Sequence, residues 1–141
     1  MASKIFVNLP VANLDVSMAF FRRLGFDFNP QFTDETAACM VISDDIFAML
    51  LTHAKFAPFT PRKIADARQT TEVLTCLSVD SKERVNEIAD AAKSSGGEEL
   101  REAQDHGFMY LRCFSDPDGH IWEIVWMDPA FARQADEAAA S

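Results

Sequence analysis

Hydrophobic and polar residues follow an order of strand and helix patterns that occurs twice along the chain. The apolar run over residues 4–11 is typical of a buried strand, and a helical pattern follows it and ends at Gly25. We expect Asp15 or Ser17 to cap that helix. Three further strand-like stretches complete this first unit, at residues 26–32, 37–42 and 46–52. The pattern predicts one β–α–β–β–β module over residues 4–52.

The same order of patterns returns over residues 72–127. A strand pattern comes first, and Asp80-Ser81 is expected to cap a helix that stops at Gly96-Gly97. Strand-like stretches follow at residues 98–103, 107–114 and 120–126. The connecting segment 53–71 carries several basic residues and a helix start signal at Thr60-Pro61. The tail, 128–141, is alanine-rich and is expected to be a frayed helix.

The two modules can be aligned by residue number. Phe6 aligns with Leu74, an offset of 68 positions, and Leu50 with Glu123, an offset of 73. The repeat predicts an α+β fold of two tandem βαβββ modules, in which residues 1–141 form one domain. The length of 141 residues is that of a single domain with one core.

The composition narrows the class of partner. The net charge of −9 disfavours a nucleic acid, because affinity for phosphate backbones depends mainly on Lys and Arg. It is compatible with small molecules, including cationic ones, and twelve phenylalanines predict a core or cavity with aromatic walls.

Cysteines and apolar runs indicate the compartment. Cys39, Cys76 and Cys113 all lie in apolar strand-like runs, without a CxxC pair, and are interpreted as reduced, buried residues. No basic segment followed by a long apolar stretch suggests export, and no window reaches the roughly 18 apolar residues of a membrane span. We therefore expect a cytoplasmic protein without a membrane partner.

Two motifs carry a resemblance to a known family. They are Leu9-Pro10-Val11…Leu14-Asp15…Ser17…Phe20-Phe21…Leu24-Gly25-Phe26 and Asp116-Pro117-Asp118-Gly119-His120…Trp122-Glu123. With the repeat, they resemble the vicinal oxygen chelate superfamily of glyoxalase I, bleomycin-resistance proteins and extradiol dioxygenases, over about residues 4–127. The resemblance implies two modules whose sheets curve into an open cup, the glyoxalase/bleomycin resistance/dioxygenase fold, and a homodimer.

The resemblance also implies where a metal would be held. Metal-bearing relatives place ligands on the first and last strand of each module, which correspond here to Phe6, Leu50, Leu74 and Glu123. Only Glu123 can donate a lone pair, and a divalent ion needs three or more protein donors. The sequence therefore disfavours a divalent metal, and no cofactor is predicted.

Strand alternation proposes the neighbours of Glu123 in the cup. Phe6, Asn8, Leu50 and Leu74 are expected on the cup face as ligand-binding residues. Tyr110 and Arg112 form a polar set on the strand before Glu123, so we expect them on the same face. In this hypothesis Arg112 pairs with Glu123 in place of a metal, and the alternative, a purely structural ion pair, has even weight.

The three histidines are weaker candidates. His106, in an acidic loop, is a ligand-binding candidate at the cup mouth. His53 and His120 are expected to face away from Glu123 by strand parity.

Three functional hypotheses stay open. The first is a metal-dependent glyoxalase-type lyase or dioxygenase in which Glu123 is catalytic as a general base. The second is a protein that binds a small organic molecule in the cup without metal or proven catalysis, like an antibiotic-sequestering bleomycin-resistance protein. The third is a structural dimer with a vestigial cup. Whether the chain is an enzyme is left undecided.

Overall fold

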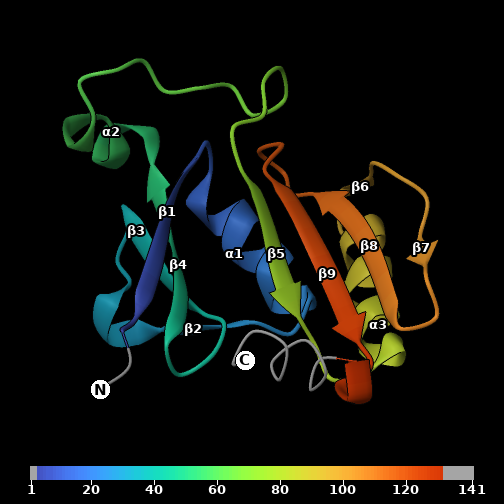
Figure 1. Cartoon of the computed structure of the whole chain (residues 1–141). Helices are drawn as coiled ribbons and strands as arrows, with labels where there is room; N and C mark the ends of the chain where they lie inside the picture. The colour runs from blue at the N-terminus through green and yellow to red at the C-terminus, as the bar shows by residue number, and fades with distance from the viewer. Residues whose placement is uncertain (1–2, 132–141) are drawn as a thin grey trace, which may run out of the picture.

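The described part of the chain, residues 3–131 of a computed structural model, consists of two β-sheets with helices (Figure 1). The strands are β1 (Ile5–Val11), β2 (Asp27–Asn29), β3 (Ala37–Val41), β4 (Ile46–Thr52), β5 (Leu74–Ser78), β6 (Glu98–Glu99), β7 (Gln104–Asp105), β8 (Met109–Ser115) and β9 (Ile121–Met127). The helices are α1 (Leu14–Arg23), α2 (His53–Phe56) and α3 (Lys82–Ser94), with two 3₁₀ turns, η1 (Pro30–Phe32) and η2 (Ala57–Phe59). The expected α+β architecture is confirmed.

Each module forms a sheet of its own. The first sheet has the order β1-β4-β3-β2, and the second has the order β5-β9-β8-β6, with β7 also paired to β8. In both modules the first strand pairs in parallel with the last strand, and the other pairs are antiparallel. The strands β1 and β5 therefore occupy equivalent edge positions, as the sequence repeat predicts.

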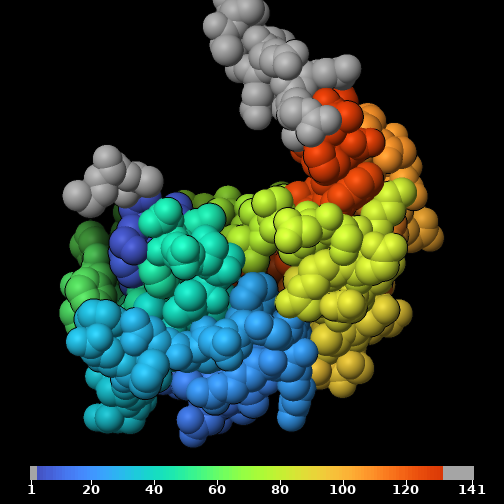
Figure 2. Space-filling view, turned by 90° about the horizontal axis from the view of Figure 1, so that it is seen from below, coloured from blue at the N-terminus to red at the C-terminus, as the bar shows by residue number. Residues whose placement is uncertain are grey.

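One hydrophobic core joins the two modules. The helices α1 and α3 lie behind the sheets in Figure 1, and the outline in Figure 2 is hollowed on the opposite side. Phe20, Phe21 and Trp122 are each 1% exposed in the core behind the sheets. The ring of Phe21 on α1 packs edge-to-face on Trp122 of β9, with 5.2 Å between ring centroids. Because α1 belongs to the first module and β9 to the second, this packing fixes the modules against each other.

Both long helices begin at an N-cap residue whose side chain accepts a hydrogen bond from a backbone N–H of the first turn. Asn13 caps α1 and Ser81 caps α3, each by accepting a hydrogen bond from an N–H three residues later at 3.1 Å. The prediction of Ser81 is correct, but Asp15 and Ser17 lie inside α1 and do not cap it. Gly25 follows the end of α1 with a φ of 100°, which glycine adopts without a steric penalty.

Three expected elements differ from the structure. The strand expected at 26–32 is short, because Pro30 starts the turn η1 and has no N–H for a strand ladder. The strand expected at 98–103 is reduced to β6, and the short strand β7 follows only at Gln104–Asp105. The helix expected at Thr60 lies earlier, as α2 and η2. Residues 132–141, most of the tail expected to be a frayed helix, lie outside the described residues.

The turn between β8 and β9 links the modules. The Asp118 carboxylate accepts hydrogen bonds from the Ala12 N–H at 2.8 Å and from the Ser17 hydroxyl at 3.2 Å. The His120 Nε2 contacts the Pro10 carbonyl at 2.7 Å. The turn motif therefore connects β9 to the end of β1 and the start of α1.

A second carboxylate organises the inside of this turn. Asp116 is 5% exposed and accepts hydrogen bonds from the N–H groups of Asp118 (2.9 Å) and His120 (3.0 Å) and from the Trp122 indole N–H (3.1 Å). Burial raises the pKa of the Asp116 carboxyl, and the neighbouring His120 opposes that rise. The hydrogen bonds of the Asp116 carboxylate therefore give this part of the turn motif a structural role.

None of the helices within residues 3–131 combines the length and the apolar character that crossing a membrane would require.

Candidate functional site

The register of the first sheet shows which side chains face the hollow side of the molecule, here called the cup face. Phe6 lies beside Phe47 and Asn8 beside Met49, and both β1 residues are exposed. Leu50 has the opposite orientation and is 0% exposed in the core. The expectation that Leu50 lies on the cup face is therefore wrong, and Met49 has that position.

The second sheet has the same arrangement. Leu74 and Cys76 on β5 are exposed on the cup face, and Cys76 lies beside Glu123 of β9. The pair Asn8–Met49 is therefore equivalent to the pair Cys76–Glu123. The last strands of the two modules are offset by 74 positions rather than the expected 73. Because the first strands are offset by 68, the second module carries six additional residues between its first and last strand.

The corrected set of metal-ligand positions does not fit a divalent ion. It contains two hydrocarbon side chains, Phe6 and Leu74, one weakly coordinating thioether, Met49, and one carboxylate, Glu123. Within residues 3–131, no group of three His, Cys, Asp or Glu side chains is arranged to hold a metal ion. A stable site needs at least three such donors, so the donor set of the cup face does not support a resident divalent ion.

The counter-charge of Glu123 is Arg101. The Arg101 guanidinium donates to the Glu123 carboxylate at 2.5 Å, with side-chain exposures of 46% and 15%. Arg101 lies in the irregular connection between β6 and β7. A fixed cation therefore already occupies the space beside the carboxylate of the cup face.

Arg112 and Tyr110 belong to a different network, on the helix side of the second sheet. Arg112 donates to Glu99 at 2.9 and 3.1 Å and to Asp90 at 2.8 Å. The Tyr110 hydroxyl donates to the Asn86 side chain at 2.8 Å. Hydrogen bonds from Arg112 lower the pKa of the Glu99 carboxyl. The expected pairing of Arg112 with the cup carboxylate is wrong.

Two cysteines flank the cup carboxylate. Cys76 of β5 and Cys113 of β8 lie on either side of Glu123. Cys113 and Cys39 are buried, as expected, but Cys76 is exposed. Partial burial, and then the Glu123 charge, raise the pKa of the Cys76 thiol. A thiol with a raised pKa is a poor nucleophile at neutral pH, so Cys76 acts here as an uncharged part of the cup wall.

An aromatic pair forms the opposite wall of the cup. The rings of Phe6 and Phe47 stack with centroids 4.8 Å apart and an interplanar angle of 9°. Phe6 is 49% exposed, and the Lys4 ammonium lies 5.4 Å from the centroid of Phe47. This side of the cup offers a flat apolar surface.

The histidines do not form a joint site with Glu123. His106 is exposed in the turn that leads into β8, with its ring 6.3 Å from Phe108. His53 begins α2, and His120 is held by the Pro10 carbonyl.

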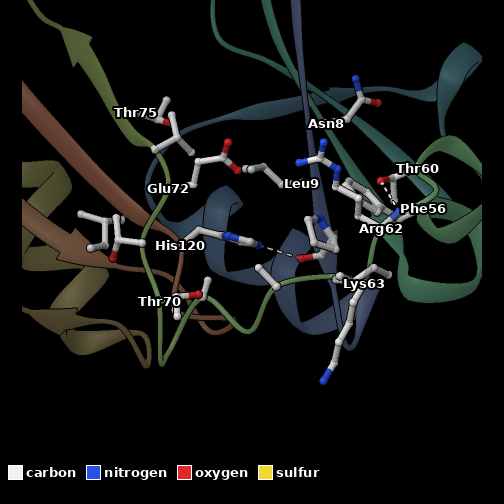
Figure 3. A pocket seen from close by; sticks show the side chains of 18 residues that line it. Asn8, Leu9, Phe56, Thr60, Arg62, Lys63, Thr70, Glu72, Thr75 and His120 are labelled. Carbon is white, nitrogen blue, oxygen red and sulfur yellow. Dashed lines mark hydrogen bonds between the residues drawn. The ribbon is translucent and has the colours of Figure 1, made fainter.

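A separate hollow lies at the seam between the modules (Figure 3). Its volume is about 350 Å³, and its walls are the end of β1, the starts of β5 and β9, and the connecting segment. Arg62, Lys63 and Glu72 are its charged lining residues. Asn8 and Ile121 belong both to this hollow and to the cup face.

Comparison with known proteins identifies the kind of fold. The sequence model of the Glyoxalase/Bleomycin resistance protein/Dioxygenase superfamily matches residues 5–124. A search of curated proteins gave no match. The chain is similar to the hypothetical protein SA1046 of S. aureus, with 24% identity, a TM-score of 0.75, and coverage of 89% of this chain and 94% of that one.

Two further solved structures have the same fold. A glyoxalase/bleomycin resistance protein/dioxygenase family enzyme from Burkholderia phytofirmans PsJN is 16% identical, with a TM-score of 0.73 over 89% of this chain and 99% of that one. A bleomycin resistance determinant encoded on the transposon Tn5 is 21% identical, with a TM-score of 0.62 over 89% and 98%. At these identities the similarity establishes the fold alone.

Proposed function

Because the chain belongs to the glyoxalase/bleomycin resistance protein/dioxygenase superfamily, we propose that it binds a small organic molecule on the cup face without a divalent metal. The observation that carries this proposal is the ion pair between Arg101 and Glu123. Glu123 is the one carboxylate among the four positions that correspond to metal ligands, and a side chain of the same protein neutralises it. The other three positions, Phe6, Met49 and Leu74, carry apolar side chains.

The ligand is a molecule with a flat aromatic part. The exposed face of Phe6, backed by Phe47, offers a stacking surface, and stacked aromatic pairs contribute about 0.5–1.5 kcal/mol beyond their buried area. Cationic aromatic compounds gain further attraction from the ring faces and from the net charge of −9. Bleomycin-type drugs and catechols are therefore the aromatic compounds to test, and methylglyoxal–glutathione adducts test the lyase alternative.

A thermal-shift screen of these compounds with metal-free protein tests the proposal. We expect at least one aromatic compound to raise the Tm, and the Phe6→Ala variant to lose about tenfold in affinity for it. Phe32→Ala is the matched control, because Phe32 is 61% exposed but lies in η1, away from the cup face. Stoichiometric metal in the purified protein together with turnover of a dicarbonyl adduct or catechol would instead establish the metal-dependent lyase or dioxygenase.

We also propose that a second copy of the chain covers part of the cup face. Leu74 and Met127 are 53% and 37% exposed, together with the 49% exposed Phe6. Apolar surface of this kind on one side of a molecule marks an interaction surface. A homodimer would bury these side chains and enclose the ligand.

Sedimentation velocity should therefore give about twice the chain mass of 15.7 kDa. The Leu74→Arg variant should dissociate to the monomer, because it places a charge in a buried interface. Val16→Arg is the control, since Val16 is 50% exposed on α1, which packs on the far side of the sheets. A monomeric wild-type protein at 50 μM would contradict the dimer without affecting the proposed ligand.

A further inference from the structure

We propose that the hollow at the seam, here called the seam pocket, is a second binding site and takes a small organic monocarboxylate. The proposal is independent of ligand binding on the cup face. The pocket's volume of about 350 Å³ lies within the usual range for sites of small organic ligands. It is lined by four separate parts of the chain, and residues of the connecting segment lie on more than one side of it (Figure 3).

The connecting segment that forms part of the pocket is basic, although the protein as a whole is acidic. The chain has a net charge of −9, yet segment 53–71 contains four basic residues and one acidic residue. Two of the four, Arg62 and Lys63, line the pocket. Neither takes part in any of the ion pairs found within residues 3–131. In Figure 3 the Lys63 ammonium points away from the pocket, so Arg62 is the cation that favours an anionic ligand there, because its guanidinium can bind a carboxylate through two parallel hydrogen bonds.

The remaining lining residues suit an organic acid. Hydroxyl and amide groups also line the pocket, contributed by Asn8, Thr60, Thr70, Thr71 and Thr75. The Thr60 hydroxyl oxygen accepts a hydrogen bond from the backbone N–H of Arg62 at 3.0 Å and keeps its own hydrogen available for donation to a ligand. Apolar contact is provided by Phe56, Ile64 and Ile121, which match a hydrocarbon or aromatic body.

Glu72 restricts the charge of the ligand to one negative unit. In Figure 3 the Glu72 and Arg62 side chains reach toward the pocket from opposite sides. A ligand with one carboxylate can bind at Arg62 and place its uncharged end near Glu72. A dicarboxylate of similar length would bring its second charge close to Glu72 and be repelled.

The wall of the pocket is fixed in place. The Arg68 guanidinium donates to the Pro117 carbonyl, and the backbone N–H of Arg68 donates to the Asp66 carboxylate at 3.0 Å. The backbone of Gly119 passes so close to this segment that a Cβ would lie 2.9 Å from the Arg68 nitrogen. The connecting segment is therefore attached to the turn of the second module, and the pocket exists before a ligand binds.

The test compares phenylacetate with phenylacetamide, its neutral analogue, by isothermal titration and by ¹H–¹⁵N NMR of the full chain. We expect phenylacetate to bind at least tenfold more tightly than the amide. The Arg62→Gln variant should bind phenylacetate about tenfold more weakly, as expected for loss of a charged hydrogen-bond donor. The Glu72→Gln variant should bind it more tightly, because the repelling charge is removed.

Arg23→Gln is the matched control, because it makes the same change in net charge at an exposed position on α1. It should leave the affinity for phenylacetate unchanged, and the shifted NMR signals should be those of Thr60, Thr70 and Thr71. Equal binding of the amide, no binding of phenylacetate, an equal loss in Arg23→Gln, or shifts centred on Phe6 and Glu123 would each overturn the proposal. None of these outcomes depends on the aromatic compounds that test the cup face.

Discussion

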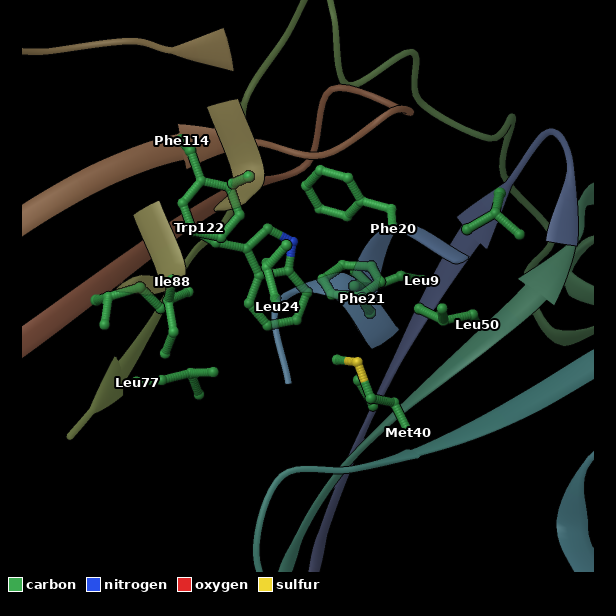
Figure 4. Packing of buried hydrophobic residues seen from close by; sticks show 14 of the residues in the cluster. Leu9, Phe20, Phe21, Leu24, Met40, Leu50, Leu77, Ile88, Phe114 and Trp122 are labelled. Carbon is green, nitrogen blue, oxygen red and sulfur yellow. The ribbon is translucent and has the colours of Figure 1, made fainter. Parts of the chain in front are cut away.

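Replacing Trp122 by alanine is expected to remove most of the stability of this protein. Trp122 is 1% exposed, and it contacts Phe21 of the other module at a centroid distance of 5.2 Å (Figure 4). Truncating a buried tryptophan costs about 3–5 kcal/mol. Loss of its N–H to the buried Asp116 carboxylate adds about 1–3 kcal/mol. Because small domains are stable by about 5–15 kcal/mol, we expect a marginally folded variant by urea unfolding followed by circular dichroism.

Trp122→Phe separates the two contributions. It keeps an aromatic ring against Phe21 but leaves the Asp116 carboxylate without one of its three donors. We expect a loss of about 1–3 kcal/mol for an unsatisfied buried acceptor, together with a smaller loss of packing. A loss below about 2 kcal/mol for Trp122→Ala would show that the two modules do not depend on this contact.

The order of elements could be predicted from the sequence because it depends on periodicity. Alternating and 3.6-residue hydrophobic patterns depend only on residues near one another in the sequence. The same is true of the glycines and capping residues that mark the ends of helices and strands. The strand boundary expected at residue 103 failed because it was determined by longer-range pairing. The stretch 98–103 has the composition of one strand, but the chain leaves β8 after Glu99 and returns to it at Gln104.

The orientation of β4 could not be predicted, because its sequence is apolar on both faces. Every residue from Ile46 to Leu51 is hydrophobic, so the sequence does not show which side chains of β4 face the cup and which face the core. A shift of one residue reverses every side chain of a strand. The alignment of Leu50 with Glu123 contained such a shift, and only the pairing of β4 with β1 shows that Met49 is the equivalent residue.

The partner of Glu123 could not be predicted for a different reason. Polarity suggested that Tyr110 and Arg112 face the cup, but polar groups can also face a helix whose side chains satisfy them. Here Asn86 on α3 accepts hydrogen bonds from both side chains. Arg101, in contrast, comes from an irregular segment, in which periodicity carries no information on orientation.

The second sheet consequently has two arginine–carboxylate systems on opposite faces, and they can be distinguished by mutation. Replacing Arg112 by methionine is expected to lower stability without changing ligand binding on the cup face. The side chain of Arg112 is 10% exposed, and that of its partner Glu99 is 21% exposed. Breaking a buried ion pair costs about 3–5 kcal/mol, and because Asp90 is 68% exposed we expect the lower part of that range in urea unfolding.

Lys93→Met is the control for this variant. Lys93 also approaches Glu99, at 3.9 Å, but it is 65% exposed, so its removal should cost less than about 1 kcal/mol.

The two variants should also differ in pH dependence. Arg112 lowers the pKa of Glu99 in the folded protein below its ordinary value of 4.5, so the stabilisation is complete above that value and is lost as the pH falls. The stability difference between wild type and Arg112→Met should therefore shrink in acid. If Arg112→Met instead lost ligand binding on the cup face at unchanged stability, the separation of the two faces would be contradicted.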